Sequence, residues 1–166
     1  MNADSIRRLY DYSYWASEKV WDCIMQLTDE QFTQDTGYSS GSIRNHVVHM
    51  MSAERRWMQR VRGEAVSPNL LFDDYPTPAA TKVKWDAVKV EVLDYIHSLD
   101  QEQLDEIVHS EIQSRELHFS LRRWELLLHV ANHATDHRAQ ILTLLNRHFG
   151  VETVEQDMLF YLIEQA

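Results

Sequence analysis

Three histidines spaced four residues apart, in a long segment of helical periodicity, constrain this chain more than any other feature of its sequence. They are His129, His133 and His137, and residues 126–142 around them contain no glycine or proline. Apolar residues recur here at intervals of three and four, which is typical of an amphipathic helix. At about 100° per residue, His133 and His137 share the face expected to meet a core with these residues: Leu126, Val130, Ile141 and Leu144.

Imidazoles on a core-facing stripe need compensation, because a buried ring nitrogen requires a hydrogen bond or a metal. Two histidines at i and i+4 can direct nitrogens toward one point, as in the HExxH zinc helix. Eight residues of helix span about 12 Å, so all three histidines do not easily share one ion. One pair therefore needs a third ligand from another helix. The competing interpretation is that these histidines are satisfied core residues.

The composition predicts one mostly helical domain over residues 1–166. Hydrophobic residues make up 44% of the chain, enough for a core, and only four glycines and three prolines interrupt its helix-forming stretches. The net charge of −10 disfavours binding to nucleic-acid phosphates. The single Cys23 excludes an internal disulfide and is expected to be a packed small residue. With a charged N-terminus and no membrane-spanning apolar run, we expect a soluble, cytoplasmic protein without a membrane partner.

Helical periodicity predicts four substantial helices, over about residues 5–27, 42–62, 79–99 and 121–148. Short helical segments are expected after Thr28 and over residues 154–163. Residues 63–78 hold all three prolines and little periodicity, and a connection of this length indicates a crossover between the second and third helices. The apolar stripe of the third helix is expected to comprise Val83, Val88, Val92, Leu93 and Ile96.

Between Asp105 and Ser120 the helical pattern changes to alternation of polar and apolar residues, which predicts a short β-hairpin or irregular excursion. His109 and His118 are expected there as exposed or edge residues. The one Glu-x-x-His match, which begins at Glu106, falls in this excursion. A di-iron carboxylate bundle needs such a motif on two helices and is therefore excluded.

The predicted second helix carries His46 and His49, but its apolar residues spread around the helical wheel. Periodicity alone therefore leaves either histidine able to face a partner helix. Together with the histidines of the fourth helix, they suit a four-helix bundle whose core holds a metal site. Two ligands from the fourth helix and one from the second would leave an open coordination position, which is typical of catalytic sites.

Several short motifs, taken together in their order along the chain, indicate a protein family. They are Tyr-x-x-Trp-Ala from Tyr12, Ser-Ile-Arg from Ser42, Ala-Glu-Arg-Arg-Trp from Ala53, Arg-Gly-Glu from Arg62, His-x-x-x-His-x-x-x-His-Arg-x-Gln-Ile from His129, and Phe-Tyr-Leu from Phe160. In order and spacing the chain resembles the DinB-like family, named for DNA-damage-inducible proteins, over nearly its whole length. The resemblance implies an all-α four-helix bundle of up-down-down-up topology, which agrees with the long connection, and a homodimer.

The resemblance also implies a divalent transition metal, such as Zn, Ni or Fe, held by three histidines. The family's ligand on the second helix lies eight residues before the Trp, which selects His49 over His46. The pair on the fourth helix ends just before the Arg, which selects His133 and His137. His129 is then expected beside the metal ligands or in a pocket.

Two acidic residues are candidates for supporting roles. Many relatives carry a second His where this chain has Asp136, which is expected either to hydrogen-bond a ligand ring or to lie on the solvated surface. Glu54, beyond His49 on the second helix, is a candidate general base or outer partner of the site. A salt bridge with Arg55 or Arg138 is the alternative role for Glu54.

Three neutral imidazoles leave a bound divalent ion with its full charge, which activates a coordinated water or thiol near neutral pH. The family resemblance adds thiol-dependent S-transferases, a thiol-dependent isomerase and a metal hydrolase as related activities. The sequence therefore predicts a metal-dependent transferase or hydrolase acting on a small molecule, with a low-molecular-weight thiol as candidate cofactor. The alternative is a non-enzymatic, stress-related metal-binding protein with a structural ion, and no substrate-specific motif decides between them.

Overall fold

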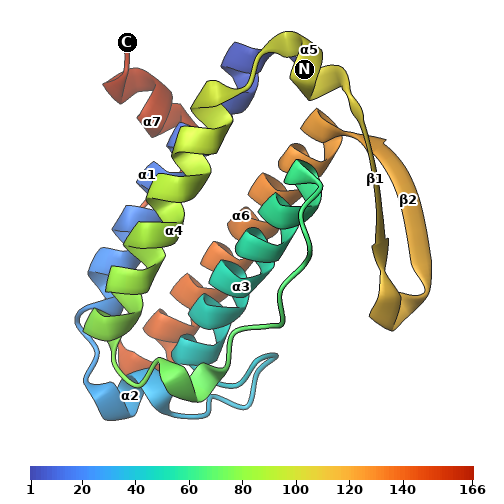
Figure 1. The fold of residues 1–166 in the computed structure, drawn as a ribbon. Coiled ribbons are helices and arrows are strands. Elements are labelled where there is room, and N and C mark those ends of the chain that lie inside the picture. Colours follow the sequence, from blue (N-terminus) through green and yellow to red (C-terminus); the bar gives the residue numbers. More distant parts are fainter.

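Four long helices pack side by side in the computed structural model, which describes residues 1–166 (Figure 1). They are α1 (Ala3–Ile24), α3 (Ile43–Arg62), α4 (Pro78–Ser98) and α6 (Arg123–Phe149). The shorter elements are α2 (Asp29–Thr33), the 3-10 turn η1 (Phe72–Asp74), α5 (Gln101–Asp105), β1 (Ile107–Ile112), the 3-10 turn η2 (Gln113–Arg115), β2 (Leu117–Arg122) and α7 (Met158–Glu164). The predicted four-helix bundle is confirmed. No helix combines the length and apolar character needed to cross a lipid bilayer.

The connection between α3 and α4 determines the topology of the bundle. It runs back along the length of α3, so that α4 starts at the same end of the bundle as α3 and is parallel to it (Figure 1). Hydrogen bonds hold this connection to α3, because Leu70 N donates to Ser52 Oγ at 3.1 Å and Ser67 N donates to Gln59 Oε1 at 3.0 Å. The up-down-down-up order with a long crossover is therefore confirmed.

Capping residues define the ends of the long helices. Ser42 Oγ accepts a hydrogen bond from Asn45 N at 3.1 Å and so caps the start of α3. Gly63 ends the same helix at a φ of 73°, a left-handed conformation that glycine adopts without strain. Pro78 occupies the first turn of α4, where its missing N–H leaves no hydrogen bond unmade.

The two strands form an antiparallel hairpin beside α3, at the end of the bundle where α6 begins (Figure 1). Val108 pairs with Leu121 across the hairpin and is buried, whereas His109 and His118 are exposed. The predicted hairpin and the exposed positions of its two histidines are therefore confirmed.

The core confirms the predicted stripe of α6 and corrects that of α4. The four apolar residues predicted to share a face with His133 and His137 are each no more than 4% exposed. On α4, Val92 and Ile96 are buried, but Val83 is 69% exposed and the unpredicted Trp85 is 3% exposed. An indole removes more apolar area from water than a valine side chain, so the helix orientation that buries Trp85 is favoured even though it exposes Val83.

Replacing Trp85 with alanine should lower the free energy of unfolding by about 3–5 kcal/mol, because a large core side chain is deleted. Trp85 packs edge-on against Trp21, with ring centroids 6.0 Å apart, and against Tyr14 at 6.4 Å. Urea unfolding monitored by circular dichroism measures this loss. Val83→Ala on the exposed face is the matched control and should change stability by less than about 0.5 kcal/mol. Equal losses for the two variants would contradict the observed orientation of α4.

Candidate metal centre

Three histidine side chains from two helices converge inside the bundle. One ring nitrogen from each of His49, His133 and His137 lies within 4.8 Å of the other two. The ring centroid of His137 is 4.9 Å from that of His49 and 4.4 Å from that of His133. The structure thus brings together the three residues that the family resemblance selected, and their role as metal ligands stays a prediction.

The helix geometry explains this convergence. His133 and His137 are one turn apart on α6, so their rings lie on the same face. The helix α3 packs against α6 and presents His49 toward that face. Ser42 fixes the start of α3, and the packing of the long helices fixes its position along α6. Neither constraint is local to the histidines themselves.

The nitrogens fit the dimensions of a metal site. His137 Nε2 lies 3.1 Å from His133 Nε2. Two nitrogens bonded at about 2.1 Å to one tetrahedral ion are about 3.4 Å apart, so the two rings need little movement to share an ion. His137 is buried, and His49 and His133 are half-buried. The cluster is therefore partly shielded from water while one side stays accessible.

Burial keeps these imidazoles neutral. It lowers the pKa of His49 and of His137. It lowers the pKa of His133 to about 4, with further contributions from His137 and His49. A metal binds only the unprotonated nitrogen, so all three lone pairs are available at neutral pH.

Gln140 is an outer partner that the sequence analysis did not identify. It lies one turn beyond His137 on α6, and Gln140 Oε1 and His137 Nδ1 are both buried atoms without a hydrogen-bond partner. Its proximity raises the pKa of His137, against the effect of burial. A hydrogen bond from His137 Nδ1 to this oxygen would fix the tautomer and orientation of the ring. The signal was present in the sequence, as the Gln three residues after the last His of the motif.

The other candidate residues on α6 lie outside the histidine cluster. Asp136 is exposed and accepts a hydrogen bond from Gln140 Nε2 at 3.1 Å rather than from a histidine ring. Its charge nevertheless raises the pKa of His133 and of His137, which opposes the effect of burial. His129 is exposed and packs edge-on against Trp57, with ring centroids 4.8 Å apart.

His46 lies behind the cluster and is not part of it. Its side chain is 0% exposed, and neither ring nitrogen has a side-chain or backbone hydrogen-bond partner. The ring stacks on Tyr38 at a centroid distance of 6.1 Å and lies 6.1 Å from the ring of His137. Burial lowers the pKa of His46, so the ring packs as a neutral aromatic group.

Glu54 faces the bundle interior between Tyr14 of α1 and Arg138 of α6. Burial raises the pKa of its carboxyl to about 7, although the Tyr14 hydroxyl and the charge of Arg138 oppose this rise. Arg138 itself donates hydrogen bonds to Ser13 Oγ at 2.9 Å and to Gln156 Oε1 at 3.0 Å. Neither of the predicted salt bridges of Glu54, with Arg55 or with Arg138, is among the ion pairs of the structure.

A cavity of about 660 Å³ opens beside the histidine cluster, between α3, α6 and the hairpin. His49, His133 and His129 line one part of it. The rest of its wall comprises Ala53, Arg56, Trp57, Arg60, Asn69, Ile112, Ser114, Arg115, Leu117, Phe119, Leu121 and Leu126. No carboxylate lines this cavity. The cavity could not be predicted from sequence, because its wall joins segments that are far apart in the chain.

Comparison with solved structures identifies two proteins that share this fold. A DinB-like protein from Bacillus cereus ATCC 10987 has a TM-score of 0.60 at 18% identity, covering 86% of this chain and 91% of that protein. YfiT from Bacillus subtilis has a TM-score of 0.58 at 18% identity, covering 90% of this chain and 89% of YfiT. YfiT is described as a probable metal-dependent hydrolase with an unusual four-helix bundle topology.

Comparison of sequences identifies the family to which the chain belongs. Protein DinB of Bacillus subtilis (strain 168) is 26% identical over 170 residues, which cover 96% of this chain and 95% of that protein. The model of the DinB family matches residues 1–165. Because this match extends over almost the whole sequence, the chain belongs to the DinB family.

Proposed function

We propose that the protein is a metal-dependent enzyme, a transferase or hydrolase, whose divalent ion is held by His49, His133 and His137. The observation that carries this proposal is the convergence of three neutral ring nitrogens within 4.8 Å. A cavity of about 660 Å³ beside them provides room for a small-molecule substrate. The description of YfiT as a probable metal-dependent hydrolase supports the same class of chemistry.

The chain's own residues would hold and orient the reacting groups. An ion bound by three imidazoles supplies the positive charge that lowers the pKa of a coordinated water or low-molecular-weight thiol. Gln140 would orient His137, and the indole of Trp57 would exclude water from one wall of the cavity. Three imidazoles suit Zn, Ni and Fe alike, so the ligands leave the metal undecided. The homodimer implied by the family resemblance is part of this proposal.

Among the candidate bases, His129 is the one placed to move a proton at the reacting atoms. It lines the same cavity as His49 and His133 without belonging to the histidine cluster. Glu54 does not line that cavity, and Asp136 is directed to Gln140. We therefore assign the proton-transfer role to His129 and a structural role to Glu54.

The alternative function is a non-enzymatic metal-binding protein in which the ion stiffens the bundle. The observation in its favour is that no carboxylate lines the cavity, so that one exposed histidine is the only free base there. The two functions differ in coordination. A structural ion is saturated by protein ligands, whereas a catalytic ion keeps a position for an exchangeable ligand.

Protein purified without chelator or metal-affinity resin should contain about one transition-metal ion per chain, as for a single three-histidine site. Loss of an outer partner costs about 10–100-fold in metal affinity, so His49→Ala, His133→Ala and His137→Ala should each cost more. Elemental analysis and competition with a chelator measure both quantities. His109→Ala, on the exposed hairpin, is the matched control. Wild-type protein that stays metal-free after incubation with Ni²⁺, Zn²⁺ and Fe²⁺ would exclude the metal site.

The cobalt-loaded protein distinguishes the two functions. If the ion keeps an open position, adding mercaptoethanol should produce a thiolate-to-cobalt absorption band, because the thiol occupies that position. His129→Asn should retain the metal and this band while it lowers turnover in thiol-transfer or ester-hydrolysis screens. An unchanged spectrum at saturating thiol, together with resistance to chelation, would favour the structural ion. Full turnover by His133→Ala would also contradict the proposal that the protein is a metal-dependent enzyme.

Glu54 should make the metal-free protein less stable as the pH rises. Its pKa is about 7 in the folded chain and 4.5 in the reference state, so the folded protein retains a proton that the unfolded chain releases. The contribution to stability is complete below pH 4.5 and is lost as the pH rises through about 7. Glu54→Gln should therefore lose less stability between pH 5 and pH 8 than wild type in urea unfolding. The exposed variant Glu64→Gln is the control, and identical pH dependence in all three proteins would refute this assignment.

A further inference from the structure

Two arginines beneath the hairpin lack a counter-charge. Arg56 and Arg60 lie one turn apart on α3, and Arg60 is only 8% exposed. Arg60 Nε donates to the carbonyl oxygen of Glu111 at 3.4 Å, and Arg60 Nη1 donates to that of Arg56 at 3.3 Å. Arg56 donates to Asn69 Oδ1, and its Nε is buried without a partner. Neither guanidinium forms an ion pair, and a buried charge without one is costly.

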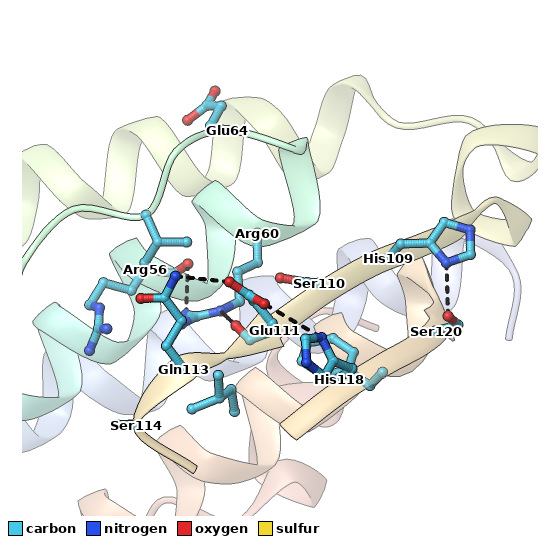
Figure 2. Close-up of a pocket in the computed structure, with 13 residues that line it drawn as sticks. Arg56, Arg60, Glu64, His109, Ser110, Glu111, Gln113, Ser114, His118 and Ser120 are labelled. Atoms are coloured by element: carbon cyan, nitrogen blue, oxygen red, sulfur yellow. Dashed lines mark hydrogen bonds and ion pairs between the residues drawn. The ribbon is translucent and has the colours of Figure 1, made fainter. Parts of the chain in front are cut away.

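The acidic residues nearby do not compensate these charges. The carboxylate of Glu111 accepts a hydrogen bond from Gln113 Nε2 at 2.9 Å and pairs with His118 Nδ1 at 3.4 Å (Figure 2). Glu64 is directed away from both arginines (Figure 2). Burial lowers the pKa of Arg60, and repulsion from Arg56 lowers it further. The positive charges of Arg56 and Arg60 are therefore not balanced by a neighbouring carboxylate.

Both arginines line two cavities that adjoin beneath the hairpin. One is the cavity beside the histidines, and the other, of about 860 Å³, lies between α3 and the hairpin strands (Figure 2). The two cavities share Arg56, Arg60, Ile112, Ser114 and Phe119. A ligand in the first cavity can therefore reach the arginines without a change of fold.

Between the arginines and the histidines the cavity wall is apolar. Trp57, Phe119 and Leu126 line it, and the Arg60 guanidinium stacks over the Trp57 ring at 5.1 Å. Seven residues of α3 separate His49 from Arg56, which is about 10 Å along the helix axis. A ligand that spans this distance needs an anionic group at one end and several carbon atoms before the other.

We propose that this cavity binds a small organic anion, with its carboxylate or phosphate at Arg56 and Arg60 and its apolar body against Trp57, Phe119 and Leu126. The planar forks of two arginines match the oxygens of such a group. The far end of the ligand then lies beside the histidines. This orientation rests on the proposed function, because that end would be the reacting one, but anion binding itself requires no metal.

The test uses metal-free, full-length protein and two probes with the same carbon skeleton, phenylbutanoate and the neutral phenylbutanol. Isothermal titration calorimetry should show at least about tenfold tighter binding of the acid, because hydrogen bonds to charged groups are the stronger ones. Arg56→Gln and Arg60→Gln should each weaken acid binding about tenfold and leave alcohol binding unchanged. Arg55→Gln is the matched control, since Arg55 donates to the Pro68 carbonyl oxygen at 3.2 Å and does not line the cavity.

Thermal unfolding shows whether each variant is folded. If Arg60→Gln does not fold, the proposal is tested with Arg56→Gln, because Arg56 is the less buried of the two residues. Equal binding of each anion and the alcohol, no binding of either anion, or equal weakening by Arg55→Gln and Arg56→Gln would each overturn the proposal. Phenylbutyl phosphate, as a third probe, distinguishes a phosphate site from a carboxylate site, and tight binding of either anion supports it. Because the titrations use metal-free protein, their result does not depend on whether the metal experiments succeed. Acid binding that appears only in metal-loaded protein and survives Arg56→Gln would overturn it.

Discussion

The packing of α3 against α6 is the interaction on which the rest of this structure depends. It brings His49 from one helix to His133 and His137 of the other, inside a bundle whose neighbouring positions are apolar. A polar ring in such a place costs least free energy when it is neutral and its nitrogens have partners. Burial lowers the pKa of each ring and so supplies the first condition. A shared cation would supply the second, which is why the same packing that stabilises the fold also defines a chemical site.

The chain's long connection and its hairpin extend this site in two different ways. The connection makes α3 and α4 parallel and lies along α3, where Asn69 accepts a hydrogen bond from Arg56. The hairpin covers the end of α3 and supplies Phe119 to the cavity wall. Without these two segments the histidines would lie at an open groove between helices. With them, the cluster adjoins a cavity that has an apolar wall and a cationic end.

The net charge of the chain is negative, whereas the charge at this cavity is positive. The sequence has a net charge of −10, yet neither Arg56 nor Arg60 forms an ion pair with a carboxylate beneath the hairpin. Glu54 is half-buried and faces the bundle interior, where burial raises the pKa of its carboxyl to about 7. An overall negative surface with a local positive cavity disfavours polyanions such as nucleic acid but leaves a small anion a place of favourable potential.

The sequence by itself determined the four helices, the hairpin and the crossover, because these depend on local periodicity, capping residues and connection length. The core face of α6 also followed from periodicity, since Leu126 and Ile141 repeat in phase with His133 and His137. Local pattern did not determine the face of α4, where Trp85 rather than Val83 is buried, or the choice between His46 and His49, for which the family motif was needed. The tertiary structure alone decided the cavity, the orientation of Glu54 and the uncompensated arginines. Each of these depends on contacts between segments that are distant in the chain, and the pairing of such segments is fixed by packing rather than by any local signal.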